Sequence, residues 1–216
     1  MTTAFAGRAV AGAVLLALSA ASVLAGCAPT LNYLTGFETV NEDGTVNAVI
    51  EITAGTSAKF EVTGDGSAIE QDQIAGRPRF IEYLSYPANY GMVPRTLEDP
   101  ALGGDGDPLD VIVLGEAIGR GDVVAVRLIG VLRMIDTGER DDKLIAVVPG
   151  TPLAAAGDIA ELDRMFPGVT IILRTWFTNY KGPGRVEIEG IDDAAAAQRI
   201  LEGAVAAFER NQEQTP

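Results

Sequence analysis

A β-rich region is predicted between residues 48 and 148, where apolar and β-branched residues occur in runs, either consecutively or at every second position. Short turns that contain glycine separate these runs, and no sequence repeat is present. The predicted strands cover residues 48–52, 58–62, 110–114, 122–134 and 143–148.

The last third of the chain predicts helices instead. Asp192 is placed to cap a helix that extends to about Asn211, with apolar residues at helical spacing along one face. Residues 168–180 also show helical spacing, but their Val-Thr-Ile-Ile-Leu run is equally typical of a strand. The pattern as a whole predicts one α+β domain, a small barrel with helices packed outside it.

The first 27 residues resemble a bacterial export signal. Arg8 is the only charged residue before Cys27, and the stretch between them is rich in Ala, Leu and Val. The run Leu24-Ala25-Gly26-Cys27 is similar to the lipobox, the site at which lipoproteins are cleaved before the cysteine that receives the lipid. The alternatives are an ordinary signal peptide, or a membrane-spanning anchor with a chance cysteine.

This resemblance divides the chain into three parts. We expect a lipoprotein signal peptide over residues 1–26, a tether and leader over 27–46, and the folded domain over 47–216. The lipid on Cys27 would anchor the protein outside the cytoplasm to a bacterial membrane, in the periplasm or at the cell surface.

Charge and composition narrow the chemistry. Acidic residues outnumber basic ones by 30 to 16, so the surface repels nucleic acid, which is therefore not an expected partner. The chain has no histidine, and Cys27 is its single cysteine. Serine–histidine hydrolases, histidine-ligated zinc and internal disulfides are thereby excluded. The carboxylate, lysine, arginine and tyrosine side chains that remain suit hard cations and phosphate oxygens.

Two acidic clusters stand at the ends of predicted strands. Asp105-Gly-Asp-Pro-Leu-Asp110 leads directly into one strand, and Asp136-Thr-Gly-Glu-Arg-Asp-Asp-Lys143 follows another. The first is not an EF-hand, since it has proline at its fourth position and leads directly into a predicted strand. Either cluster alone is typical of a solvated turn; the two together favour a site for metal and phosphate.

Residues 105–111 resemble the signature heptapeptide of the family I soluble inorganic pyrophosphatases. Further matches follow in the family's order, from about Val46 to the C-terminus. They are Glu51, Lys59, Glu61, Tyr86-Pro-Ala-Asn-Tyr90-Gly91, residues 130–136, Asp141, Lys143 and Tyr180-Lys181. The resemblance implies a five-stranded OB-type β-barrel with helices outside, a helix over residues 168–180, and metal-dependent hydrolysis of pyrophosphate to two phosphates.

The resemblance also implies a role for each matching residue. Metal ions would be held by Asp105, Asp110 and Asp141, with Asp136 and Glu51 helping to hold the metals that arrive with substrate. Asp107 would accept the proton of the attacking water. Substrate would be bound by Lys59, Tyr90, Lys143, Tyr180 and Lys181, with Glu61 and Tyr86 in support.

Electrostatics favour the same chemistry. Pyrophosphate is a polyanion, and at about 5 Å and an effective dielectric of 20 each like-charge pair costs roughly 3 kcal/mol. A pocket of carboxylates therefore admits pyrophosphate only when cations accompany it. Mg²⁺ is the expected cofactor, because the ligands are all oxygens and the substrate is a phosphate.

The chain also departs from the family. Pro78 stands where the family has a substrate-binding arginine, so we assign that role to Arg79 rather than Arg77. The segment after Lys181 is short, and Arg185 is expected to replace a basic residue there. The histidines that join trimers in bacterial hexamers are absent, so a homo-oligomer remains only one possible assembly.

Two other functions compete with this interpretation. One is a lipoprotein that binds calcium or phosphate through a decayed site, which would have lost the base or the phosphate-binding cations first. Asp107, Lys59 and Lys143 are all present. The other is a hydrolase of different phosphoanhydrides such as nucleotides, which an aromatic platform for a base would favour.

The lipobox resemblance generates a test. Cys27→Ser removes the thiol that would receive the lipid, so we expect an unlipidated protein whose precursor the lipoprotein signal peptidase leaves uncleaved. Metabolic labelling with a fatty acid and mass spectrometry of the N-terminus measure both. Cleavage of the variant at the same bond would favour an ordinary signal peptide.

Overall fold

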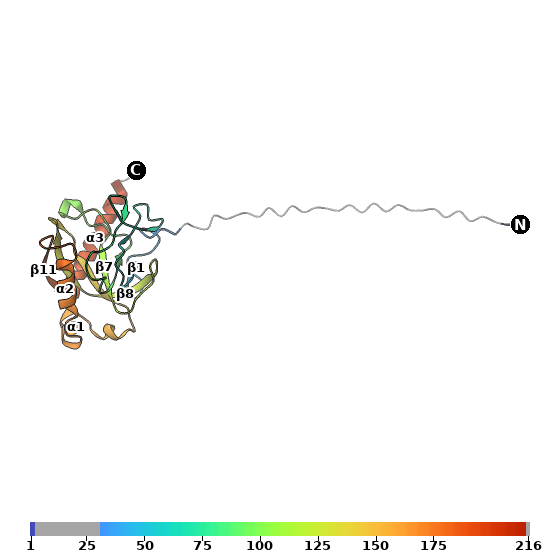
Figure 1. Ribbon diagram of the computed structural model, residues 1–216. Helices are drawn as coiled ribbons and strands as arrows, with labels where there is room; N and C mark the ends of the chain where they lie inside the picture. Colours follow the sequence, from blue (N-terminus) through green and yellow to red (C-terminus); the bar gives the residue numbers. More distant parts are fainter. Residues whose placement is uncertain (3–30, 215–216) are drawn as a thin grey trace. The chain divides into compact units, whose positions relative to one another are not determined.

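The computed structural model of the chain describes residues 1–2 and 31–214 (Figure 1). The predicted signal peptide and Cys27 lie outside these residues. The described helices and strands all belong to one structural unit that begins at Leu31. Among the described residues, no helix is long and apolar enough to cross a membrane.

Within that region, the main sheet is built from strands that pair in a ring. Its strands are β1 (Val46–Ile52), β6 (Asn89–Met92), β7 (Asp110–Leu114), β8 (Val123–Asp136), β9 (Glu139–Arg140), β10 (Lys143–Val147) and β11 (Val186–Asp193). The pairings run β1–β6–β7–β10–β8 and return to β1. β8 closes the ring because it is 14 residues long, so its first part pairs with β1 and its later parts with β10 and β11.

Shorter elements and helices surround this sheet. Two small hairpins pair β2 (Phe60–Val62) with β3 (Ile69–Gln71), and β4 (Gln73–Ile74) with β5 (Arg77–Pro78). The helices are α1 (Ile159–Met165), α2 (Val169–Asn179) and α3 (Ala194–Gln214). Short 3₁₀ turns cover Pro100–Leu102 and Pro152–Ala155.

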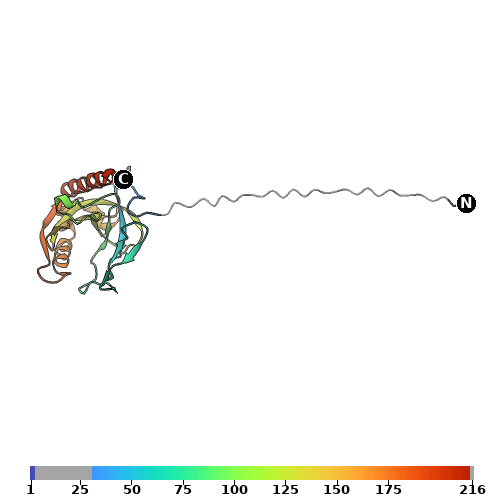
Figure 2. The same cartoon turned by 90° about the horizontal axis from the view of Figure 1, so that it is seen from above.

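Several strands of the main sheet, β7 and β10 among them, are buried on both faces. In β7, Val111 and Val113 pack in the apolar cluster that includes α3, whereas Ile112 and Leu114 pack in the cluster that includes α2. The two helices accordingly lie on different sides of the sheet (Figure 2). Burial on both faces explains why these strands are almost continuously hydrophobic in sequence.

Most predicted elements appear with small shifts, and the helix predicted over residues 168–180 is α2. The predicted cap of the last helix was wrong. Asp193, not Asp192, accepts a hydrogen bond from the Ala196 amide at 2.8 Å. The reason is strand pairing, since β11 continues along β8 as far as Asp193 and the helix begins only after it.

Gly91 allows a bulged strand to approach its neighbour closely. The register of β1 against β6 shifts between Ile50 and Ile52, which leaves Glu51 as the extra residue. A Cβ atom on Gly91 would lie 1.8 Å from the carbonyl oxygen of Val49 in β1. Because that contact is with backbone, it cannot be relieved by a side-chain rotation. A bulge turns a side chain in a new direction, and here that side chain is Glu51.

Gly91→Ala should therefore destabilise the protein by about 3 kcal/mol, since the added methyl group forces β1 and β6 apart. Urea unfolding measures the change. Gly203→Ala is the matched control, because this exposed glycine lies within α3 with no other atom near its would-be Cβ. It should stabilise the helix by up to about 1 kcal/mol. Equal stability of the two variants would contradict the close approach at Gly91.

Candidate active site

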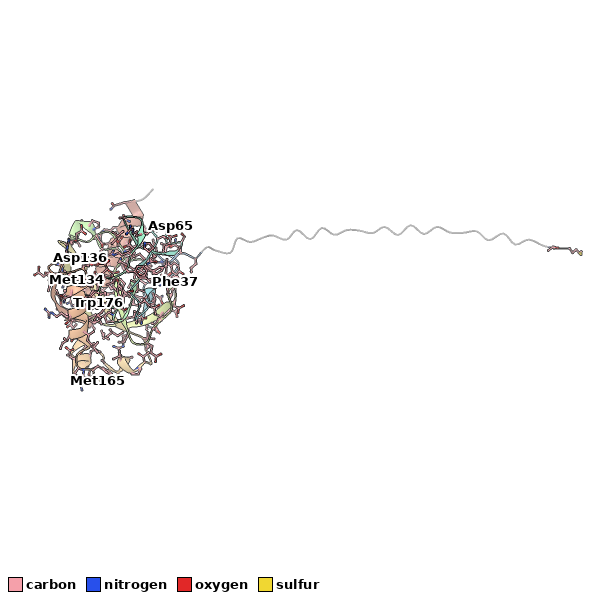
Figure 3. All side chains as sticks on the ribbon, in the orientation of Figure 1. Phe37, Asp65, Met134, Asp136, Met165 and Trp176 are labelled. Carbon is pink, nitrogen blue, oxygen red and sulfur yellow. The ribbon has the colours of Figure 1, made fainter. Side chains whose placement is uncertain are left out.

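A cleft of about 570 Å³ opens at one end of the strand ring and combines two kinds of charge. Its carboxylates are Glu51, Glu61, Glu98, Asp105, Asp107, Asp110, Asp136 and Asp141. Its basic and phenolic side chains are Lys59, Arg79, Arg95, Lys143, Lys181, Tyr86, Tyr90 and Tyr180. Asp136 is labelled in Figure 3 and lies at the end of β8. The cleft thus offers oxygen ligands for cations beside donors for an anion.

The structure brings all but one of the residues predicted for the folded domain's site into this cleft. Arg185 is the exception. It lines a neighbouring groove, its side chain is exposed, and its carbonyl accepts a hydrogen bond from the Thr137 amide at 3.1 Å. The structure thus places Arg185 immediately before β11, outside the cleft in which the sequence analysis expected it.

Arg79 lines the cleft and Arg77 does not. Two backbone hydrogen bonds fix the position of Arg79. The Lys59 amide donates to the Arg79 carbonyl at 3.1 Å, and the Arg79 amide donates to the Asp72 carbonyl at 2.7 Å. The guanidinium group of Arg79 also pairs with the Asp72 carboxylate at 2.7 Å. Arg79 is therefore held beside Lys59.

Lys143 is the buried centre of the site. Its ammonium group lies 2.5 Å from Asp110 Oδ2 and 2.7 Å from Asp141 Oδ1, and its side chain is only 1% exposed. The parallel pairing of β7 with β10 sets Lys143 directly opposite Asp110. Burial alone would lower the pKa of Lys143, but the two carboxylates outweigh it and hold the pKa well above its usual value. The lysine therefore stays charged.

Tyr90 completes this centre from the neighbouring strand. Its hydroxyl donates a hydrogen bond to Asp110 Oδ2, the same oxygen that Lys143 contacts. Burial raises the pKa of Asp110, with a further increase from the Asp141 charge, while Lys143 opposes both. The two donors thus offset part of the rise in the pKa of Asp110.

Glu51 is buried on the bulge of β1. Its Oε1 accepts a hydrogen bond from the Val62 amide at 2.7 Å, which ties β1 to β2. Burial, followed by repulsion from Asp110, raises the pKa of Glu51 to about 8. The carboxyl group is therefore protonated near neutral pH unless a cation binds to it.

The opposite wall is held by aromatic packing. Tyr180 stacks on Trp176 of α2 with 4.7 Å between ring centroids, and Trp176 also contacts Tyr86 at 4.6 Å. This packing places Lys181 at the cleft, where it forms an ion pair with Asp136 Oδ2. The other oxygen, Asp136 Oδ1, is buried without a hydrogen-bond partner among the described residues. Such an orphaned oxygen suits a bound cation.

Glu98 is a site residue that the sequence analysis missed. Carboxylate oxygens of Glu98, Asp105 and Asp141 all lie within 4.8 Å of one another. Burial and the Asp110 charge raise the pKa of Glu98 to about 9. Backbone hydrogen bonds fold its loop onto the acidic motif, since the Glu98 amide donates to the Asp107 carbonyl at 2.8 Å. Its position in a long loop was the only sequence signal available. An all-carboxylate group of this kind fits a hard divalent cation.

The pKa of Glu51 generates a prediction for the metal-free protein. A carboxyl group whose pKa rises on folding favours the folded state at low pH, and this contribution is lost as pH rises from 4.5 to about 8. Glu51→Gln should therefore flatten the fall in stability over this range, as measured by urea unfolding in chelator. Glu70→Gln, at an exposed position of β3, is the control and should leave the slope unchanged. Parallel curves for Glu51→Gln and the unmodified chain would contradict the assignment.

Comparisons with known proteins agree with this geometry. The family model described as inorganic pyrophosphatase matches residues 48–209. The chain is 43% identical over 152 residues to soluble inorganic pyrophosphatase 1, chloroplastic, of Chlamydomonas reinhardtii, which covers 65% of the chain and 54% of that protein. The inorganic pyrophosphatase of Drosophila melanogaster is 38% identical over 159 residues, covering 66% and 47%. The chain thus spans about half the length of these curated relatives.

Solved structures of inorganic pyrophosphatases also resemble the fold of this chain. The type I inorganic pyrophosphatase of Toxoplasma gondii superposes with a TM-score of 0.78 at 32% identity, covering 83% of this chain and 88% of that one. The structure from Schistosoma japonicum superposes equally well, with a TM-score of 0.78 at 28% identity, covering 83% and 71%. The sequence match, the superposition and the acidic cleft together show that this chain belongs to the inorganic pyrophosphatase family.

Proposed function

We propose that this protein hydrolyses inorganic pyrophosphate to two phosphates with the help of divalent cations, and that Mg²⁺ is the physiological one. The observation that carries the proposal is the composition of a single cleft. Carboxylates suited to cations and side chains suited to phosphate oxygens line it together. Family membership supports the same reaction.

The carboxylates would hold the cations. Asp105, Asp110 and Asp141 would hold two of them, with Glu98 close to this group, and Glu51 and Asp136 would help to hold those that enter with substrate. When bound, such cations neutralise phosphate charge and make a water molecule more acidic. The buried Asp136 Oδ1 and the protonated Glu51 are the groups that stand to gain most from a cation.

We assign to Asp107 the role of accepting the proton of the attacking water. Its backbone amide donates to Asp105 Oδ1 at 2.8 Å, which fixes the turn of the acidic motif, while its side chain remains exposed at the cleft. The cleft wall still removes part of its solvent, and this partial desolvation, followed by the charges of Asp105 and Asp110, raises the pKa of Asp107. A base with a raised pKa accepts a proton more readily near neutral pH.

The positively charged side chains of the cleft would bind the phosphate groups. Lys59 pairs with Glu61, Arg79 with Asp72, and Lys181 with Asp136. These carboxylates hold the cationic side chains in position before substrate arrives. Tyr180 and Lys143 also line the cleft and add an O–H and an N–H donor. Charge that develops on the leaving phosphate would meet donors already in place.

Two further proposals concern architecture and location. We infer that the ring of five paired strands is an OB-type barrel, which the closed cycle of pairings and the position of the cleft at its end support. We also infer that residues 47–216 form the catalytic domain and that Cys27 carries a lipid outside the cytoplasm. The lipobox resemblance and the presence of a single cysteine support this location.

Phosphate release from pyrophosphate tests the reaction. We expect two phosphates per pyrophosphate when Mg²⁺ is added and none in excess EDTA, because the substrate cannot enter the acidic cleft without cations. Colorimetric phosphate measurement with the purified chain is sufficient. Equal rates with and without EDTA would refute the metal-dependent mechanism.

Two matched variants test the division of roles. Asp110→Asn should lose most activity and also bind Mg²⁺ more weakly, because it removes a central charge. Asp107→Asn should keep its Mg²⁺ affinity but lose roughly 10²-fold in rate, as expected for a missing base. Isothermal titration with Mg²⁺ separates the two effects. Indistinguishable titrations would show that the roles are wrongly divided.

A further inference from the structure

The hairpin that carries much of the site contains a break in its hydrogen-bond ladder. β9 pairs with β8 through Ile135 and Arg140, and β10 pairs with β8 through Leu132 and Lys143. Between these pairs, residues 141–142 belong to no strand. The break lies immediately before Lys143, which contacts Asp110, so a shift of the backbone there would displace the centre of the cleft.

The side chain of Asp142 bridges this break. The Asp141 amide still donates to the Met134 carbonyl at 3.1 Å, but the Met134 amide donates to Asp142 Oδ1, also at 3.1 Å. A carboxylate thus takes the place of a backbone acceptor. Because Met134 is fully buried, its amide would otherwise lose a partner that water cannot replace.

Asp142 is itself buried and held by two arginines. Only 3% of the residue is exposed, and its Oδ2 accepts a hydrogen bond from Arg133 Nε at 2.8 Å and contacts Arg140 at 3.4 Å. The same guanidinium groups reach Asp192 at 3.4 Å and Glu189 at 3.3 Å, both in β11. The buried charge is therefore satisfied, and the hairpin is joined through it to the next strand.

Asp142 does not line the cleft, whereas its two neighbours do. Asp141 and Lys143 flank it in sequence, and their side chains meet at 2.7 Å inside the site. Asp136, at the far end of the same hairpin, also lines the cleft. The positions of three site residues thus depend on the backbone geometry of one hairpin. The Asp142 carboxylate maintains that geometry by accepting the Met134 hydrogen bond where the strand pairing is interrupted.

We propose that Asp142 is a positioning residue, which sets Asp141 and Lys143 for cation binding and catalysis without touching substrate. The proposal rests on the function proposed above for the cleft. Its consequence is that loss of the Asp142 charge impairs cation binding and turnover in a protein that remains folded.

Asp142→Asn is the informative substitution. Asn keeps an oxygen for the Met134 amide but replaces Oδ2 by an NH₂ group, a donor that faces the donor Arg133 Nε. We expect turnover of pyrophosphate to fall on the order of 10-fold to 100-fold, as for small displacements of catalytic groups, with a smaller change in KM. Isothermal titration without substrate should show weaker Mg²⁺ binding.

Asp192→Asn is the matched control, because it also removes an acidic contact of Arg133. The Asp192 side chain is 48% exposed and lies outside the cleft. This variant should keep the turnover and Mg²⁺ affinity of the unmodified chain. Circular dichroism and thermal unfolding must show that each variant is folded at the assay temperature. A purely structural role for Asp142 predicts a lower melting temperature with unchanged turnover and Mg²⁺ affinity, and that result would overturn the proposal.

The remaining outcomes also decide the question. If Asp142→Asn fails to fold, Arg133→Gln takes its place, since it removes the guanidinium contact to Asp142 and leaves the hydrogen bond from the Met134 amide. Unchanged Mg²⁺ affinity and turnover of this variant would overturn the proposal. Losses in both would support it. If the unmodified chain releases no phosphate from pyrophosphate, the proposed function fails, while Mg²⁺ titration of the variants still tests the role of Asp142.

Discussion

The crowding of carboxylates in one partly buried cleft is the constraint on which the rest of this structure depends. Like charges repel, and burial removes the water that would screen them. Two features reduce this repulsion. Lys143 is buried between Asp110 and Asp141 as a countercharge. The pKa values of Glu51 and Glu98 are raised to about 8 and about 9, so these groups carry less negative charge near neutral pH. Both features leave a site that gains stability when cations bind.

The strand pairings deliver these groups to one place. The parallel register of β7 and β10 brings Asp110 and Lys143 together, and the bulge in β1 turns Glu51 into the same region. Gly91 makes that bulge possible, because its missing side chain lets β1 and β6 approach. Sheet geometry thus brings Asp110, Lys143 and Glu51 together, whereas loops supply Glu98, Asp105 and Asp141.

Sequence reasoning worked best where the chemistry is local. The spacing within residues 105–110 and the strand that follows are both present as expected. It was undecided over residues 168–180, because β-branched residues at helical spacing fit either structure. Packing decides there: Trp176 and Tyr180 stack in a way that requires one turn of helix between them. Arg79, which the sequence favoured over Arg77, lines the cleft, although both arginines also line the neighbouring groove.

By itself, the sequence determined the acidic charge, the absence of histidine and the order of the motifs, and these already restrict the chemistry to oxygen ligands and phosphate. Only the tertiary structure decided that Glu98 joins the carboxylate group, that Arg185 lies outside the cleft, and that Asp142 spans a break in the hairpin. The physical reason is common to all three. Each depends on hydrogen bonds and burial created by strands and loops that meet only in the folded chain, and no local pattern of residues records which oxygen or amide will be left without a partner.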